Sequence, residues 1–177
     1  MKFVETRLTD AFIVEVERLE DERGYFALNW SDRDFEAAGL DARLVECNVS
    51  FNRSKGTLRG MHYQEAPHEQ VKLVRCTRGA IYDVIIDLRP ASTTFKQWLG
   101  VELTAENARM LYVPAGFAHG FQTLADNTEV SYQMSSHFER TSGRGVRWDD
   151  PAFGIEWPQT DHRIIITRDR EYPDFRQ

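Results

Sequence analysis

The residues best suited to chemistry in this chain lie together between Gly56 and Gln64. Arg59, His62, Tyr63 and Gln64 stand within six consecutive positions of this stretch. These residue types bind anions and move protons, whereas in an ordinary core each polar group would need its own hydrogen-bond partner. The flanking residues favour a β-strand, so the polar run indicates a strand whose side chains line a cavity. His62 is the residue around which we expect a site to be built.

The geometry of a strand predicts which of these side chains can share the cavity. Alternate residues point to the same face, so Gly60, His62 and Gln64 are expected on one side and Arg59 on the other. A site that contains both Arg59 and His62 therefore requires a break in the alternation. We predict a twist or bulge at Gly60, without which Arg59 would point into solvent and leave the site.

Two other segments alternate as strands and carry residues that can reach the same cavity. Lys72 lies in the run 71–76, and Tyr132 lies in the run 129–134. If both runs point these side chains to the inside of a small barrel, His62, Lys72 and Tyr132 converge. Taken singly, each of the three is an ordinary strand residue, and the combination is what favours a catalytic site.

Most of the chain supplies the strands that must position these residues. Only the segment 31–39 has helical features, with Ser31 as N-cap and Gly39 at its end. Short β-rich runs separated by turn residues occupy 12–16, 44–50, 71–76, 80–88, 98–103, 110–113, 120–124 and 129–134. Runs of this length without interleaved helices predict a mostly β protein, an antiparallel sandwich or barrel. The stretch 143–158 is rich in Gly, Trp, Asp and Pro and is expected to wrap the outside in loops.

Length and composition limit the class of protein. The 177 residues contain no internal repeat or linker, which predicts a single domain over residues 1–177. A net charge of −6 argues against generic nucleic-acid binding. No segment approaches the roughly 18 apolar residues of a membrane span, and the charged N-terminus lacks a signal peptide. Cys47 and Cys76 match no metal or redox spacing, so we expect buried thiols in a cytoplasmic protein without membrane partners.

The segment from Pro114 to Phe121, together with the strand of His62, resembles the two conserved motifs of the cupin barrel. In metal-binding cupins the first motif carries His-x-His followed by a Glu, and the second carries one more His. Here the first motif reads His62-x-Gln64, and an amide is a poor ligand for a transition metal. The resemblance favours a metal-free, cupin-type double-stranded β-helix, a jelly-roll barrel. A metal-dependent cupin oxygenase or isomerase that uses His62 and His119 is the alternative.

A longer resemblance extends from about residue 10 to 170, in the same order and with nearly the same spacing. It is carried by 21–26, 58–64, 71–75, 83–89, 114–121, Tyr132, 144–151 and 168–169. These segments resemble the nucleotide-sugar 3,5-epimerases typified by dTDP-4-dehydrorhamnose 3,5-epimerase, metal-free members of the cupin superfamily. The resemblance implies a homodimer that epimerises a nucleotide-diphosphate 4-keto sugar. It implies no cofactor, because the carbonyl of the substrate already acidifies the neighbouring C–H bonds.

The resemblance also assigns roles to individual residues. His62 would remove the protons from C3 and C5, and Asp169 would hold its other ring nitrogen and raise its basicity. Lys72 would stabilise the enolate oxygen, and Tyr132 would return a proton from the opposite face of the sugar. The substrate-binding residues that it implies are Arg23, Arg59 and Arg168 for the diphosphate and nucleotide, His119 for the sugar, Phe138 for stacking on the base, and Asn48.

The departures from the family pattern gather at the nucleotide end. Leu28 and Gly143 replace ligand-contacting Glu residues, Phe138 replaces a stacking Tyr, and the run 47–49 is less polar than usual. The resemblance therefore favours dTDP but leaves CDP and GDP open, and it leaves open whether C3, C5 or both are inverted. A 3,4-ketoisomerase, which would move the keto group, and a non-catalytic sugar-binding cupin are the remaining alternatives.

Overall fold

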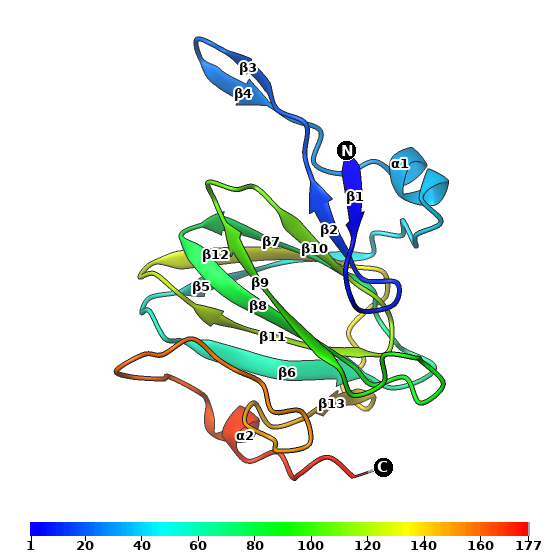
Figure 1. Ribbon diagram of the computed structural model, residues 1–177, viewed down its shortest axis with the longest axis vertical. Helices are drawn as coiled ribbons and strands as arrows, with labels where there is room; N and C mark the ends of the chain where they lie inside the picture. The colour runs from blue at the N-terminus through cyan, green and yellow to red at the C-terminus, as the bar shows by residue number, and fades with distance from the viewer. Residues whose placement is uncertain (177) are drawn as a thin grey trace.

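Two antiparallel sheets face each other in the computed structural model of the protein, which describes residues 1–176 (Figure 1). The six-stranded sheet has the order β1 (Lys2–Glu5), β2 (Phe12–Glu15), β10 (Met110–Val113), β7 (Lys72–Arg78), β12 (Thr128–Met134) and β5 (Glu46–Asn52). The five-stranded sheet has the order β13 (Gly143–Gly145), β6 (Leu58–Gln64), β11 (Phe117–Thr123), β8 (Ala80–Asp87) and β9 (Trp98–Thr104). The predicted mostly β class and antiparallel pairing are confirmed.

The main core lies between the two sheets and follows from alternation along the strands. Val74 and Cys76 of β7 are fully buried there, and Ile81 and Ile85 of β8 meet them from the other sheet. Each fully buried aliphatic side chain of this kind stabilises the fold by about 1.5–3 kcal/mol. The part of the space between the sheets that this core does not fill is lined largely by polar side chains.

A second core covers the outer face of the five-stranded sheet. Met61 and Val84 point away from the main core and pack against Phe153 and Trp157 of the C-terminal segment. Because β8 is buried on both faces, its sequence is an almost continuous apolar run. The loops predicted for 143–158 are present, but β13 was missed, since three residues of Gly-Arg-Gly carry no strand signal.

The outer face of the six-stranded sheet is only partly covered. The helix α1 (Asp32–Ala37) begins at the predicted cap, where the Asp34 backbone N–H donates to the Ser31 hydroxyl over 3.3 Å. Its Phe35 packs on Val14 and Tyr112. The other helix, α2 (Thr167–Arg170), is a single turn that the sequence did not predict. No helix within residues 1–176 is long and apolar enough to cross a membrane.

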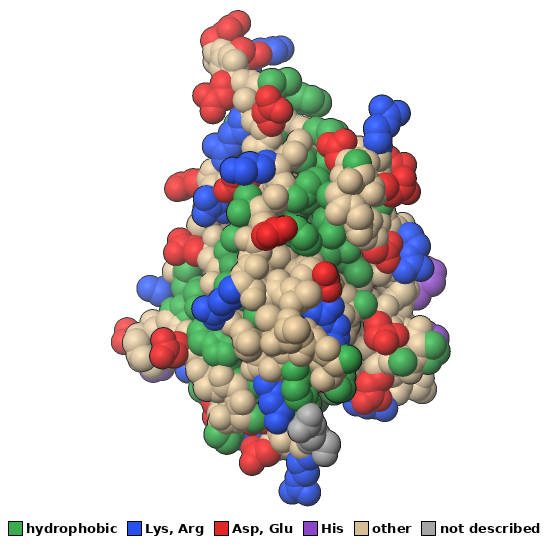
Figure 2. All heavy atoms as spheres, turned by 45° about the vertical axis from the view of Figure 1, so that its right-hand side comes forward, with side chains coloured by type: hydrophobic (Ala, Val, Ile, Leu, Met, Phe, Trp, Pro, Cys, Tyr) green, Lys and Arg blue, Asp and Glu red, His purple; other side chains and the backbone are tan. Residues whose placement is uncertain are grey.

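A hairpin of β3 (Leu19–Asp21) and β4 (Gly24–Phe26) projects from the body (Figure 1). Figure 2 shows charged side chains over its tip and hydrophobic side chains gathered below it. Phe26 of the hairpin is 72% exposed, and Val49 on the edge strand β5 is 64% exposed. Single exposed apolar residues are common, but exposed apolar side chains on a projecting hairpin and on an open edge strand are typical of surfaces that meet another chain.

The two cysteines differ from the expectation that both are buried. Cys76 lies in the main core, whereas Cys47 is exposed on the outer face of β5, and both are free thiols. The reason is the incomplete cover of the six-stranded sheet. The side chain of Cys47 lies on the part of the outer face of this sheet that α1 does not cover. The cytoplasmic location that the cysteines suggested stays a prediction.

Candidate active site

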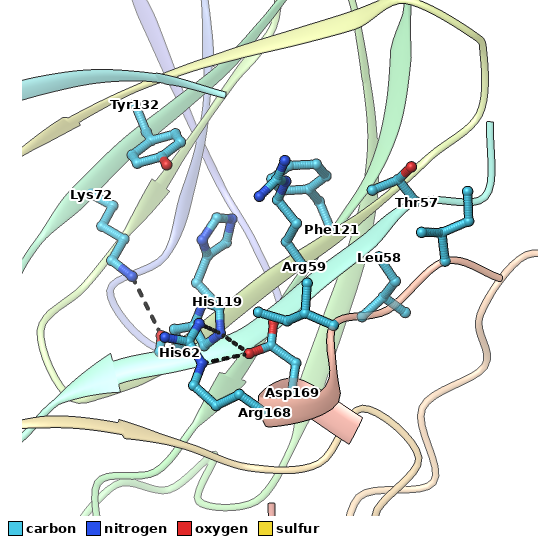
Figure 3. Close-up of a pocket in the computed structure, with 12 residues that line it drawn as sticks. Thr57, Leu58, Arg59, His62, Lys72, His119, Phe121, Tyr132, Arg168 and Asp169 are labelled. Atoms are coloured by element: carbon cyan, nitrogen blue, oxygen red, sulfur yellow. Dashed lines mark hydrogen bonds and ion pairs between the residues drawn. The ribbon is translucent and has the colours of Figure 1, made fainter. Parts of the chain in front are cut away.

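A cavity of about 400 Å³ opens between the sheets and holds seven of the ten predicted site residues (Figure 3). We call it the main cavity, and these seven are Arg59, His62, Lys72, His119, Tyr132, Arg168 and Asp169. An adjoining side cavity of about 510 Å³ shares His62, Lys72, Tyr132 and Arg168 with it and adds Asn48 and Phe138. The convergence expected for a barrel is therefore present in the structure.

The predicted irregularity at Gly60 is confirmed. Pairing of β6 with β11 is in register at His62 and at Arg59 but shifts between them, which marks a bulge. Gly60 has a φ of +132°, and a Cβ there would lie 2.5 Å from the Cα of Gly120. Only glycine meets both the conformation and the close approach. The bulge turns Arg59 and His62 to the same cavity, while Met61 between them enters the second core.

His62 is held by a buried carboxylate. Its Nε2 lies 2.8 Å from Oδ1 of Asp169, and the Gly60 backbone N–H donates to the other carboxylate oxygen over 3.1 Å. Asp169 is 1% exposed and is carried by α2, so the C-terminal segment supplies half of the pair. If Nε2–H donates to the carboxylate, Nδ1 remains as the acceptor, which is the arrangement of a general base.

The surroundings of this pair keep the histidine neutral and the carboxylate charged. Burial lowers the pKa of His62, an effect that the charge of Asp169 only partly opposes. Burial alone would raise the pKa of Asp169, but its hydrogen bonds to His62, Gly60 and Arg168 outweigh burial and lower that pKa. At neutral pH the pair is thus imidazole and carboxylate, ready to take up one proton.

Lys72 and Tyr132 face this pair from the six-stranded sheet (Figure 3). The Lys72 ammonium donates to the backbone carbonyl of His62 over 3.3 Å. Burial lowers the pKa of Lys72 to about 8, and the nearby charge of Asp83 acts against that fall. Burial also raises the pKa of Tyr132, so its hydroxyl keeps its proton at neutral pH. The site therefore has a cation and a proton donor opposite its base.

Asp83 is a site residue that the sequence analysis did not identify. It is fully buried on β8, and its Oδ1 lies 2.8 Å from Nε2 of His119. Its other oxygen has no hydrogen-bond partner among the residues that the structure describes. Asp83 thus orients His119, and its negative charge favours the protonated form of Lys72. The acids Asp83 and Asp87 within the otherwise apolar run 80–88 were the available signal, because a buried carboxylate requires a partner.

Two arginines place positive charge on the main cavity. Nε of Arg59 donates to Oδ1 of Asn52 over 2.7 Å, which fixes the guanidinium against β5. Nε of Arg168 donates to Asp169 over 3.0 Å, and its side chain is 63% exposed. Guanidinium groups match phosphate geometry, so these two positions suit an anionic part of a ligand.

Gln64 has a structural task in the side cavity. Its amide nitrogen donates to the carbonyls of His68 and His137 over 2.6 and 3.2 Å, and its oxygen accepts the Glu139 backbone N–H over 2.6 Å. Gln64 therefore holds the loop that presents Phe138. No group of three or more His, Cys, Asp or Glu placed to bind a metal ion occurs among residues 1–176.

Arg23 is the one predicted site residue that lies outside both cavities. It stands at the tip of the β3–β4 hairpin, where its Nε donates to Asp21 over 3.1 Å. Its side chain is 83% exposed. Within the one chain that the structure describes, the hairpin points away from the site, so Arg23 cannot contact a ligand bound there.

Comparison with known proteins identifies the family of the chain. The family model described as dTDP-4-dehydrorhamnose 3,5-epimerase matches residues 5–177. The dTDP-4-dehydrorhamnose 3,5-epimerase of Sinorhizobium fredii is 40% identical over 175 residues, which cover 99% of this chain and 90% of the relative.

Solved structures of similar proteins extend the agreement to the fold. The dTDP-4-dehydrorhamnose 3,5-epimerase of Elizabethkingia anophelis superimposes with a TM-score of 0.96 and 40% identity, over 99% of this chain and 96% of the other. That of Bacillus anthracis, with TDP and PPi bound, has a TM-score of 0.94 and 42% identity, over 98% and 99%. The predicted cupin-type barrel is confirmed, and the chain belongs to the dTDP-4-dehydrorhamnose 3,5-epimerase family of isomerases.

Proposed function

We propose that the protein inverts C3 and C5 of a nucleotide-diphospho-4-keto-6-deoxy sugar, linked to dTDP, without a metal ion or cofactor. The observation that carries this proposal is the placement of His62 and Tyr132 on facing sheets around one cavity. Inversion requires that a proton leaves one face of the carbon and that another arrives on the opposite face. A base and an acid on opposite walls meet that requirement.

Each inversion then takes two proton transfers. The Nδ1 of His62 accepts the proton from the carbon beside the keto group, and the electron pair of the C–H bond moves onto the carbonyl oxygen. The ammonium of Lys72 stabilises the enolate oxygen, and the carboxylate of Asp169 stabilises the imidazolium. Tyr132 donates its hydroxyl proton to the opposite face, and the electron pair returns from the oxygen to re-form the carbonyl. Proton exchange with water then returns His62 to its neutral form and Tyr132 to its protonated form.

Solvent deuterium exchange tests the reaction directly. The protein is incubated in D₂O with dTDP-4-keto-6-deoxyglucose and with its CDP- and GDP-linked counterparts, and wash-in is measured by NMR. We expect wash-in at C3 and C5 with the dTDP sugar. Wash-in at C3 alone would identify a mono-epimerase, and a displaced keto group would identify a ketoisomerase. No wash-in with any of the three sugars would overturn the proposal.

Metal independence is tested on the same assay. We expect metal analysis of the purified protein to give no stoichiometric transition metal, and we expect dialysis against a chelator to leave the exchange rate unchanged. The chemistry of the site supports this expectation, because Gln64 holds a usual ligand position with an amide, a poor transition-metal ligand, and that amide is hydrogen-bonded to backbone groups. A stoichiometric metal whose removal stops exchange would favour the metal-dependent alternative.

The rate of the proposed reaction is expected to follow a bell-shaped pH profile. His62 must be neutral to accept a proton, and burial lowers its pKa below the usual 6.5. The acidic limb, where the rate rises with pH, is therefore expected below pH 6.5. Lys72 must be charged, so the rate falls as pH rises through about 8. Lys72→Arg keeps its charge at high pH and should remove the basic limb. A wild-type kcat/KM that keeps rising above the pKa of Lys72 would contradict this assignment.

We also propose that two copies form a homodimer through the hairpin and β5. The exposed Phe26 and Val49 would be covered there, and β5 has a free edge for a further strand. In such a pair the hairpin of one copy can bring Arg23 to the other copy's cavity. Light scattering should give twice the chain mass, and Phe26→Asp should shift it toward the monomer. A monomeric wild type would contradict the dimer and remove Arg23 from the site.

A further inference from the structure

Tyr172 lies beside the base although the sequence analysis assigned it no role. It follows α2 by two residues, so the element that carries Asp169 also brings it to the site. The centroid of its ring lies 6.3 Å from that of the His62 imidazole, at an angle of 74°. Tyr172 lines the side cavity together with Phe138, Asn48 and Arg168.

Gly145 provides the space for this ring. In the pairing of β13 with β6, Gly145 stands opposite His62. A Cβ on Gly145 would lie 2.2 Å from Cε2 and Cζ of Tyr172, and its three nearest atoms all belong to that side chain. Gly145 has no positive φ, so its backbone does not require glycine. Glycine at position 145 therefore leaves room for the ring of Tyr172.

The ring of Phe138 lies over Gly143 in the same way as the ring of Tyr172 lies over Gly145. Gly143 lies on the same face of β13 as Gly145, and a Cβ on it would lie 3.5 Å from Cε2 of Phe138. Phe138 and Tyr172 thus cover two glycines of one short strand, and both line the side cavity. Phe138 is 61% exposed, which leaves its ring open to a ligand. Two neighbouring aromatic rings on a cavity wall suit a flat heterocycle.

The position of the cavities indicates which part of the ligand meets this wall. His62 and Tyr132 border both cavities, and only the main cavity adds Asp169 and His119 to them, so we place the reacting sugar there. Arg168 borders both cavities, so a diphosphate beside it joins a sugar in the one to a nucleoside in the other. Burial raises the pKa of Tyr172, so its hydroxyl stays protonated and can donate at neutral pH.

We propose that Tyr172 is a further ligand-binding residue, whose ring and hydroxyl contact the nucleoside of the nucleotide sugar in the side cavity. This inference rests on the function proposed above and adds a residue that determines affinity for the nucleoside. Gly145 is the positioning residue that admits the ring. Phe138 and Tyr172 would contact the base mainly through their rings, because Gly143 beside them has no side chain to form a polar contact.

Calorimetric titration with dTDP, which lacks the sugar, tests the contact. Tyr172→Ala should raise the Kd of dTDP about tenfold or more, because one base–aromatic contact is worth that factor. Tyr172→Phe keeps the ring and should recover most of the affinity. Phe175→Ala is the matched control, since Phe175 packs on Phe153 in the second core. That control should lower Tm and leave the Kd of dTDP unchanged.

Gly145→Ala tests the same contact without altering Tyr172. The new methyl group should displace the ring and raise the Kd of dTDP nearly as much as Tyr172→Ala does. The double variant should bind no more weakly than either single variant, because the two changes remove one contact. If Tyr172→Ala and Gly145→Ala bind dTDP within about twofold of the wild type, the inference fails while the proposed function stands. If the wild type binds no dTDP, both fail.

Discussion

Replacing His62 by alanine should lower kcat by about three orders of magnitude or more while dTDP still binds. The reason is that the proposed reaction has one base, and a positioned general base contributes about 10²- to 10⁴-fold to the rate. Two ionisable groups in the main cavity that contact His62 are poorly suited to replace it as the base. Lys72 is protonated below about pH 8, and Asp169 is buried behind the imidazole at 1% exposure. The measurement is kcat for epimer formation, paired with a dTDP titration.

Two further variants make this result specific. His137→Ala is the matched control, because His137 bonds to Glu46 over 3.1 Å at the surface and lines neither cavity within the described chain. It should leave kcat unchanged. Asp169→Asn keeps a hydrogen-bonding group but removes the charge that stabilises the imidazolium and holds its tautomer, so we expect kcat to fall by up to about 10⁴-fold. A His62→Ala variant that keeps more than roughly a tenth of kcat would show that His62 is not the base.

Local patterns predicted an antiparallel sandwich or barrel and the centre of its site, and the resemblance to cupins selected the barrel. Alternation along β6, β7 and β12 placed His62, Lys72 and Tyr132 on the inside, and the need for Arg59 beside His62 predicted the bulge at Gly60. Polar residues in a strand are costly to bury without partners, so they reveal a cavity even in a single sequence.

The parts that were missed depend on contacts between distant segments. Asp169 meets His62 across 107 positions of the chain, and its place in the site was implied only by the family resemblance. Nothing local indicates that the C-terminal segment returns to β6, where Thr57 and Ile164 form an isolated bridge. Tyr172 shows the same difficulty, since its neighbour Gly145 resembles any loop glycine until β13 is seen to pair with β6.

Replacing Tyr132 by phenylalanine should separate proton exchange from inversion. The ring stays, so the cavity keeps its shape, but the donor on the wall opposite His62 is lost. His62 can still remove the proton, exchange it with solvent and return it to the face from which it came. We therefore expect epimer formation to fall by about 10²-fold or more, while deuterium wash-in with retained configuration continues. Both are measured by NMR on one sample in D₂O.

The ratio of the two rates distinguishes this assignment from a structural role for Tyr132. Tyr82→Phe is the matched control, because Tyr82 packs against Trp157 in the second core, and it should change neither rate. If Tyr132 only shaped the cavity, its variant would disturb the position of the sugar against His62, and wash-in would fall in parallel with inversion. If another group supplied the second proton, inversion would persist. Inversion needs groups on both faces of the carbon and exchange needs one, so a selective loss of inversion places the donor opposite His62.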